Sequence, residues 1–575
     1  MKREFAFNIT ELILAAAGVL VLELMTSAFR IQLYTYCNLI LILLLVGEFF
    51  LLFKSTPYKL PALKRNALSL AFTALFLLTL LANHIFTVKP EHASLLIIPP
   101  AVLVLRNFFI LTGVFRRFNK LSSFFEGISL KPAQTILLSF LFLILTGAIL
   151  LLLPFTTTDG NQLSFLDALF TATSAVCVTG LIVVDTATTF TFWGKLIILL
   201  LIQGGGIGIM ILSYFTIFSL KKKVSLEEKI VLSYMLNEED MSHLAKSIRT
   251  IIYTSLIIEA LGTVILYFPF SKSGKDFGQT VFLSIFHAVS AFCNAGFSLF
   301  SDSLEQFKDN ITVNMVIAAL IILGGLSFAV INNLKDRIKY RINRQFRGKA
   351  SYIKLQINTK VVLIITAVLL LLGTLFIYGL EHSASLKEYS LGKQYLMAFF
   401  QSVTLRTAGF NTIPFARLTT TTLFIMTAFM FIGAAAGSTA GGIKLNNAAV
   451  IGAYIKSFLT NSNSVVIFNH SIPKEKVLKS MLILLFGLTS VITGAAILTF
   501  SENAPLRDII FETVSAFGTV GLSTGLTGNL TETGKITISI LMFMGRLGPL
   551  TILAAASRRK HKTYIQYPVG NISIG

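Results

Sequence analysis

Apolar runs about as long as a membrane is thick recur along this chain, separated by short polar or basic segments. A helix needs roughly 20 residues to cross the hydrocarbon core of a bilayer, whereas a transmembrane barrel would show short strands of alternating polarity. Of the 575 residues, 54% are hydrophobic and 13% are charged, against about 25% charged residues in soluble domains. The chain is therefore predicted to be an all-α integral membrane protein.

Four apolar runs within residues 1–125 are predicted to form additional N-terminal transmembrane helices. Lysine and arginine clusters precede the first run, separate the second from the third and follow the fourth, so they share one side if all four runs span. Basic loops favour the cytoplasmic side, and we expect the N-terminus and the basic C-terminal tail 558–575 to be cytoplasmic. The runs cover about 9–28, 35–53, 66–88 and 93–114.

The remainder is predicted to comprise four units of one design. Each unit has a long apolar run, a short amphipathic run, a glycine-containing stretch and a second long run. The glycines of these stretches recur at intervals of 112 to 116 residues, and so constant a period indicates a repeated structural unit. They are Gly180, Gly296, Gly409 and Gly521. The predicted units, each a candidate domain, cover residues 126–235, 236–345, 346–460 and 461–557.

The long runs are predicted to span the membrane. The short runs are predicted to form re-entrant helices, because about a dozen residues cannot span. The first long runs are about 132–154, 249–270, 360–380 and 477–500. The short runs are about 163–175, 278–291, 394–404 and 506–516. The second long runs are about 195–220, 313–333, 421–457 and 535–556.

The net charge of +21 is consistent with nucleic-acid binding, but the basic residues lie between apolar runs, where they set membrane orientation. Segment 335–360 is rich in lysine and arginine, has Asp336 as its single acid, and is expected on the cytoplasmic side. Acidic residues instead flank the short runs, on the expected outer side. There they either concentrate cations near a pore mouth or only keep the loops soluble. They include Asp159, Asp167, Asp185, Asp302, Glu305, Asp309, Glu381, Glu388, Glu502 and Asp508.

The sequence indicates neither an enzyme nor a zinc or disulfide framework. The three cysteines, Cys37, Cys177 and Cys293, lack metal-ligand spacing. Convergent histidine, aspartate and glutamate residues are nearly absent from the apolar runs, and no Walker motif is present. We therefore expect no catalytic residues, no ATP hydrolysis and no bound cofactor.

The four glycine stretches have the composition of an ion-selectivity filter. A monovalent cation sheds its water only where oxygens replace it, and rings of backbone carbonyls do so in potassium channels. Glycine permits the unusual torsions that such carbonyls need, and each preceding helix would direct its negative C-terminal end toward the cavity. The alternative is close helix contact through small residues. Four stretches, each between a non-spanning and a spanning helix, favour the filter.

The run 421–457 is too long for a simple span and is interrupted by glycine and hydroxyl residues. Each glycine costs about 1 kcal/mol relative to alanine in a helix, so this run is predicted to break. A break below the filter would place a flexible loop across the pore, whereas close helix packing is the alternative. The interrupting residues are Gly433, Gly437, Ser438, Thr439, Gly441 and Gly442.

Arg546 lies inside the last apolar run. A charge at membrane depth is costly, so a functional role with a partner facing the pore is the default interpretation. An arginine whose side chain extends to the membrane interface is the alternative, but the position is about a dozen residues from either end of the run.

The chain resembles the pore-forming subunits of the Trk/Ktr/HKT cation transporter superfamily over about 130–556. The resemblance rests on the four glycine stretches and on the runs SVTLRTAGFN at 402–411, GAAAGSTAGGIK at 433–444 and GRLGPLT at 545–551. It implies four membrane–pore–membrane units around one path that takes up potassium. Members with serine in the first filter favour sodium, and this chain has Gly180 there. The potassium-binding carbonyls would come from Val178, Thr179 and Gly180; Asn294, Ala295 and Gly296; Thr407, Ala408 and Gly409; and Thr519, Val520 and Gly521.

The resemblance also implies an intramembrane gate at 433–444, ending in Lys444, with Arg546 beside it. It implies a homodimer in the cytoplasmic membrane on a cytosolic TrkA/KtrA-like ring of nucleotide-binding regulatory subunits. Segment 335–360 and the tail are either docking sites for that ring or anchors beside anionic lipid. A sodium-permeable or ion-coupled transporter of the same family is the alternative function, and a non-conducting scaffold or receptor is the alternative from another class.

Overall fold

The computed structural model describes residues 132–158, 163–219, 244–272, 274, 276–347 and 354–556. The four predicted N-terminal helices, the basic cluster at 221–223 and the tail 558–575 lie outside these residues. In the described part the chain is almost entirely helical, and its single two-stranded sheet pairs β1 (Val466–Ile467) with β2 (His470–Ser471). The prediction of an all-α fold is therefore confirmed.

Among the described residues, helices occur at each run predicted for the four units, in the predicted order of long, short and long. The first long helices are α6 (Pro132–Leu151), α11 (Leu244–Ser271), α15 (Ile357–Glu381) and α19 (Lys474–Ser501). The short helices are α7 (Phe165–Val176), α12 (Phe277–Phe292), α16 (Leu391–Thr404) and α20 (Leu506–Gly518). Last in each set come α9 (Phe192–Ser219), α13 (Ile311–Gly325) with α14 (Phe328–Arg347), α17 (Thr420–Phe431) with α18 (Leu445–Leu459), and α21 (Glu532–Leu547) with α22 (Pro549–Ala556). The pseudo-symmetry of the four units stays a prediction.

Short connecting turns complete the described part. They are α8 (Thr186–Thr189), η3 (Pro154–Thr156), η4 (Glu305–Phe307), η5 (Phe415–Arg417) and η6 (Thr527–Asn529).

The long helices present apolar side chains outward. Leu261 and Phe268 of α11, Leu375 of α15 and Phe500 of α19 are all more than half exposed. In water such surfaces would promote aggregation, whereas lipid accepts them. By length and composition, the segments Thr250–Ser271, Ile357–Glu381 and Lys474–Ser501 can each cross a membrane, as can α13 and α14 if counted together as one broken span.

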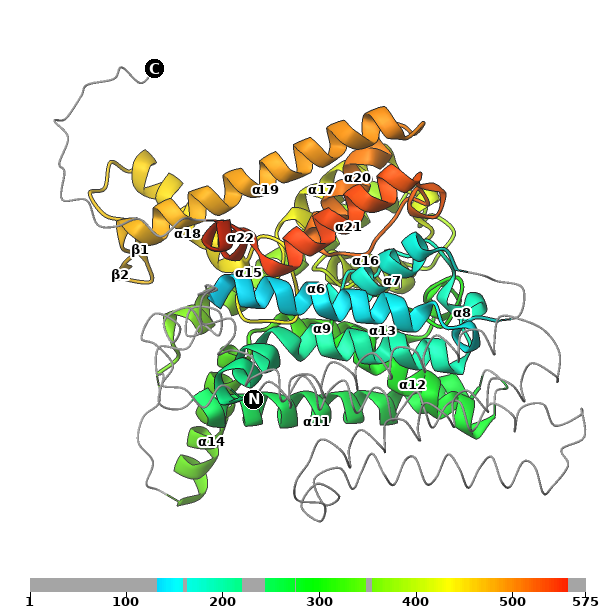
Figure 1. Ribbon diagram of the computed structural model, residues 1–575. Coiled ribbons are helices and arrows are strands. Elements are labelled where there is room, and N and C mark those ends of the chain that lie inside the picture. Colours follow the sequence, from blue (N-terminus) through cyan, green and yellow to red (C-terminus); the bar gives the residue numbers. More distant parts are fainter. Residues whose placement is uncertain are drawn as a thin grey trace, which may run out of the picture.

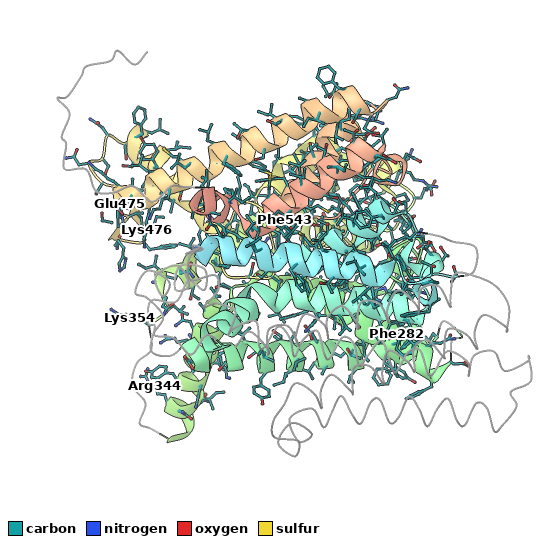
Figure 2. All side chains as sticks on the ribbon, viewed as in Figure 1. Phe282, Arg344, Lys354, Glu475, Lys476 and Phe543 are labelled. Atoms are coloured by element: carbon teal, nitrogen blue, oxygen red, sulfur yellow. The ribbon has the colours of Figure 1, made fainter. Side chains whose placement is uncertain are left out.

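The long helices α6, α11 and α19 run across the view in Figure 1, and α14, α18 and the β1–β2 hairpin lie at its left end. Helices α11, α15 and α19 each begin at that end. Figure 2 shows Arg344, Lys354 and Lys476 there too. Basic residues of segment 335–360 and of α19 thus lie at one end of the helices, together with Glu475, and this is the end that we expect to be cytoplasmic.

The second long helix is broken in three units, whereas only the break in 421–457 was expected. The predicted run 313–333 bends by 104° between α13 and α14, and α14 continues to Arg347, past the predicted unit boundary. Ser327 makes this break, because its hydroxyl accepts from the Val330 amide at 3.2 Å and so starts a new helix. The run 535–556 breaks at Gly548, whose φ of +79° no α-helix contains.

Glycines of the second helices lie directly against the ends of the short helices. A methyl group on Gly205 of α9 would lie 1.9 Å from the Val176 carbonyl oxygen at the end of α7. Gly324 of α13 has the same relation to the Phe292 carbonyl of α12, at 1.8 Å, and Gly545 of α21 to that of Phe517 in α20, also at 1.8 Å. Three of the four short helices are therefore positioned by backbone contact that only glycine allows.

Two buried carboxylates connect first helices to second helices. Glu381, at the end of α15, accepts from the Thr419 amide at 3.0 Å and from the Thr422 hydroxyl. Glu502, directly after α19, accepts from the amide and hydroxyl of Thr531 at 3.2 and 2.6 Å. Thr419 and Thr531 are the N-caps of α17 and α21, so each carboxylate holds the start of the helix that returns through the membrane.

We expect Gly324→Ala to destabilise the protein, because its methyl group would overlap the Phe292 carbonyl. Overpacking of this kind costs about 1–3 kcal/mol or more. The measurement is the thermal unfolding temperature of the detergent-solubilised protein. Gly452→Ala in α18 is the matched control: no atom lies within 4 Å of a methyl group at that position, so unfolding at an equal or higher temperature is expected. Equal effects of the two substitutions would contradict the packing described above.

Candidate functional site

Each short helix ends in a turn through left-handed backbone two residues before its glycine. The left-handed residues are Val178, Asn294, Thr407 and Thr519, with φ of 56°, 61°, 65° and 50°. In the first unit the Val178 amide donates to Ala175 at 3.1 Å and the Thr179 amide to Ser174 at 2.8 Å. These two bonds form a Schellman motif, which satisfies carbonyls that a helix end leaves free, and the second and fourth units repeat it.

This motif normally places glycine at the left-handed position, and here none of the four residues is glycine. A β-branched residue such as Val178 with positive φ is a genuine outlier. Each such residue costs of order 1–3 kcal/mol and is retained where surrounding structure enforces it. Four of them at equivalent positions indicate that the turn geometry is required at this site.

The four glycines of the predicted filter form a closed ring. A methyl group on Gly180 would lie 2.4 Å from the carbonyl oxygen of Ala295, and one on Gly296 would lie 2.8 Å from that of Ala408. The series continues from Gly409 to the Val520 oxygen at 2.9 Å. It closes from Gly521 to the Thr179 oxygen at 2.0 Å.

The ring brings together all twelve residues predicted to supply carbonyls. All four glycines have positive φ, from 70° to 95°, so each stretch has two left-handed residues with one ordinary residue between them. The carbonyls that precede the glycines therefore meet from four segments more than 100 residues apart in sequence. A ring of carbonyl dipoles of this kind can coordinate a desolvated monovalent cation.

Side chains of the short helices support the ring from behind. The Ser174 hydroxyl accepts from the Gly180 amide at 3.1 Å, and the Ser290 hydroxyl donates to the Phe297 carbonyl at 2.8 Å. His287 bonds the Ser298 hydroxyl through Nε2 at 3.1 Å. Sequence reasoning missed these roles, although Ser174 and Ser290 stand at the same distance, six residues, before their glycines.

The loop between α17 and α18 contains all the predicted gate residues except Arg546. It is anchored at its ends by the Gly433 amide, which donates to the Ile443 carbonyl at 2.9 Å, and by the Leu445 amide, which donates to Ala434 at 3.0 Å. Its far side lies against the fourth filter stretch, where a methyl group on Gly441 would meet the Thr519 hydroxyl at 2.2 Å. The loop is thus packed directly beside the carbonyl ring.

Thr439 fixes the middle of this loop. Its hydroxyl donates to the Gly324 carbonyl at 3.0 Å and to the Phe292 carbonyl at 3.3 Å, where α13 breaks and α12 ends. It also contacts Oδ1 of Asn294 at 3.4 Å, a residue of the second filter stretch. The Gly437 carbonyl accepts from the first amide of α14 at 3.5 Å. The loop therefore contacts both the filter and the break in α13.

Arg546 holds the loop from the opposite side. It is 3% exposed and lies in the last turn of α21. One guanidinium nitrogen donates to the Thr439 carbonyl, and another donates to the carbonyls of Gly205 and Gly206 in α9. The partners of this arginine are thus the backbone of the loop and the backbone of helix α9. The remaining predicted gate residue, Lys444, caps α18 and donates to the Ala440 carbonyl.

Several of the acidic residues expected on the outer side are already engaged. Asp167 pairs with Lys535 at 2.6 Å and Asp309 with Lys393 at 2.9 Å, while Glu381 and Glu502 hold helix starts. Glu305 lies beside the third filter stretch and accepts from Asn411 Nδ2 at 2.7 Å. Partial burial, and then the charge of Asp302, raise the pKa of Glu305 above its ordinary value.

Among the described residues, no group of three or more histidine, cysteine or carboxylate side chains is arranged to hold a metal ion. The filter stretches offer backbone carbonyl oxygens and the buried hydroxyl oxygens of Thr179, Thr407 and Thr519.

A family model described as "Cation transport protein" (TrkH) matches residues 118–564, which include every element described above. The chain belongs to this family of cation transport proteins. It is therefore a multi-pass membrane protein of a transport family, and membership applies to the whole segment that contains the ring, the loop and Arg546.

Curated relatives cover nearly the same region. The Ktr system potassium uptake protein B of Vibrio alginolyticus is 40% identical over 445 residues, which is 77% of this chain and 94% of that protein. The protein of the same name from Bacillus subtilis is 38% identical over 450 residues, 78% of this chain and 98% of that protein. The potassium/sodium uptake protein NtpJ of Enterococcus hirae is 37% identical over 456 residues, which is 78% of this chain and 98% of that protein.

Among solved structures, the potassium transporter TrkH from Vibrio parahaemolyticus has a similar fold. The TM-score is 0.60 with 18% identity, and the match covers 86% of this chain and 97% of that one. The likeness shows that the arrangement of helices is shared.

We expect Arg546→Gln to loosen the loop at 437–442. The substitution removes charge-assisted bonds worth about 1.5–3 kcal/mol each, so amide hydrogen exchange in this loop should accelerate by about tenfold or more. Mass spectrometry of the detergent-solubilised protein measures it. Arg507→Gln is the control, because that exposed arginine bonds Thr420 at the opposite end of α17. Unchanged exchange in Arg546→Gln would contradict the role given to this arginine.

Proposed function

We propose that the chain takes up potassium across the cytoplasmic membrane through the ring at Gly180, Gly296, Gly409 and Gly521. The observation that carries the proposal is the closure of that ring, in which each glycine adjoins the carbonyl oxygen preceding the next. Carbonyl oxygens replace the water shell of the ion, and the membrane potential drives it inward at about 2.3 kcal/mol per charge per 100 mV. The names of the curated potassium-uptake relatives support this choice of ion.

We further propose that residues 433–444 gate this path and that Arg546 holds the loop closed through its bond to the Thr439 carbonyl. The loop is non-helical at the depth of the helix breaks, and only backbone that is buried in protein or lines a cavity persists there. Its contacts to Thr519, Asn294 and Gly324 would let a movement of the loop alter the ring directly. Arg546 adds a positive charge that opposes cation passage while it remains beside Thr439.

The assembly is proposed on the family resemblance. The protein is expected to act as a homodimer in the cytoplasmic membrane, with both termini on the cytoplasmic side, on a cytosolic TrkA/KtrA-like ring of nucleotide-binding subunits. The end of the molecule that carries Arg344, Lys354 and Lys476 is the face that would contact the cytosolic regulatory subunits or anionic lipid.

The deciding experiment is growth of cells that lack potassium uptake at low external potassium, with wild type compared with Gly296→Ser. A methyl group at this glycine would lie 2.7 Å from the Gly409 α-carbon, and its φ of +70° strains any other residue. Strain of about 1–3 kcal/mol at the ring corresponds to a loss of about 5- to 150-fold in uptake. Wild type should restore growth and Gly296→Ser should not.

Gly278→Ser is the matched control, because it lies at the start of the same short helix, α12, and has no atom within 4 Å of the added group. Membrane-inserted protein is quantified for all three chains. Restored growth with Gly296→Ser equal to that with wild type would reject the ring as the ion path. Equal uptake of sodium and potassium into vesicles would instead favour the sodium-permeable alternative.

A further inference from the structure

Glu259 is a carboxylate near the middle of the membrane-spanning segment Thr250–Ser271 of α11. Its side chain is buried, with 4% exposure. Its partner is Gln203 of α9, whose Nε2 donates to both carboxylate oxygens at 3.1 Å. An ionisable residue at this depth is functional by default, and neither the ring nor the loop at 433–444 uses it.

Two other buried glutamates are satisfied much more fully. Glu381 and Glu502 each accept from at least three separate groups, which are backbone amides and hydroxyls of serine and threonine. A carboxylate can be held in its charged form by such donors. Within the described part of the chain, Glu259 accepts from one amide group and forms no ion pair. A buried carboxylate with so few donors favours the binding of a proton.

Glu259 is connected to the second filter stretch through two side chains. The Cys293 thiol donates to Gln203 Oε1 at 3.5 Å, so the Gln203 amide bridges the carboxylate and the thiol. Cys293 is the C-cap of α12 and directly precedes the left-handed Asn294. A methyl group on Gly206 would lie 2.6 Å from the Cys293 sulfur, so the thiol packs directly against the backbone of α9.

We propose that Glu259 is a proton-binding site that controls the filter through Gln203 and Cys293. The ionised carboxylate accepts from the Gln203 nitrogen and leaves the amide oxygen to Cys293. When Glu259 takes up a proton from water, it becomes a donor and attracts the amide oxygen, so the amide rotates and the thiol loses its acceptor. The turn at Asn294 then loses support, and cation flux falls as the pH is lowered.

Among the described residues, few other titratable side chains belong to the helices packed against α11, and α11 itself carries Lys246, Arg249, Tyr253 and Tyr267. On α12, His287 is bonded to the Leu283 carbonyl and to Ser298. On α9, Lys195 donates to the Ala187 carbonyl near the outer end. Helix α13 contains no titratable residue, and the charge beyond α9 is that of Arg546, on the Gly205 and Gly206 carbonyls. Cys293 itself is a thiol that retains its proton near neutral pH.

Two measurements on the full chain in liposomes test the proposal. Infrared difference spectra between about pH 5 and about pH 8 report a buried carboxyl group that gains a proton. Rubidium or potassium flux over the same range reports its effect on the filter, and this half rests on the proposed function. Wild type should show the carboxyl band and a flux at least about threefold lower at the acidic end.

The variants separate proton binding at Glu259 from the effect of that proton on the filter. Glu259→Gln mimics the neutral acid, so it should lose the band and show low flux that does not change with pH. Gln203→Met removes the bridge, so it should keep the band and lose the pH dependence. Glu388→Gln, which removes an exposed carboxylate, should behave as wild type.

A carboxyl difference spectrum in Glu259→Gln that is identical to that of wild type would overturn the proton site, and a wild-type pH profile in Glu259→Gln would overturn its control of the filter. Absence of flux at every pH in wild type would reject the proposed function instead, while the infrared band still decides the proton site. If Glu259→Gln does not insert into the membrane, Glu259→Asp is used instead. Its shorter side chain should keep the carboxyl band but should not reach Gln203. A wild-type pH dependence of flux in Glu259→Asp would therefore overturn the proposal.

Discussion

A helix that ends inside a membrane leaves its last carbonyl groups without water to bond them, and the centre of this molecule is organised around that constraint. Four short helices end there. Their free carbonyls are satisfied by left-handed turns at Val178, Asn294 and Thr519, and by the Thr439 hydroxyl at the end of α12. The same turns direct the following carbonyls into the ring. Satisfying the helix ends and forming the carbonyl ring, which is the proposed cation path, are thus one structural solution.

Close backbone contact makes that solution rigid. Gly205, Gly324 and Gly545 let the second helices contact the last carbonyls of the short helices. The ring glycines let the four filter stretches meet without side chains between them. Interfaces of this kind depend on van der Waals contact, because lipid provides little hydrophobic drive between helices. The buried carboxylates Glu381 and Glu502 complete the frame by fixing where two of the second helices start.

The loop at 433–444 is the element best suited to move. It has no helical hydrogen bonding of its own, and it is held by a few side-chain and backbone bonds from Thr439 and Arg546. Two helix breaks lie close to residues that contact the loop. The Gly437 carbonyl of the loop accepts from the first amide of α14, directly after the break that follows α13. Arg546, which bonds the loop, lies two residues before the break at Gly548. Neighbouring helices are therefore segmented at the level of the loop, which would let a change there spread without disturbing the outer halves of the spans.

The sequence alone determined the membrane class, the places of the helices, the four glycine stretches and the break in 421–457. These are local properties, because apolar length and glycine content act within a segment. It did not determine the break at Ser327, the left-handed Val178, or the bonds of Arg546 to Thr439 and α9. A serine cap competes with an apolar run, and a strained valine is tolerated only because packing enforces it. Which segments meet across more than 100 residues is decided by tertiary contact, since closing the ring requires all four units to be in place at once.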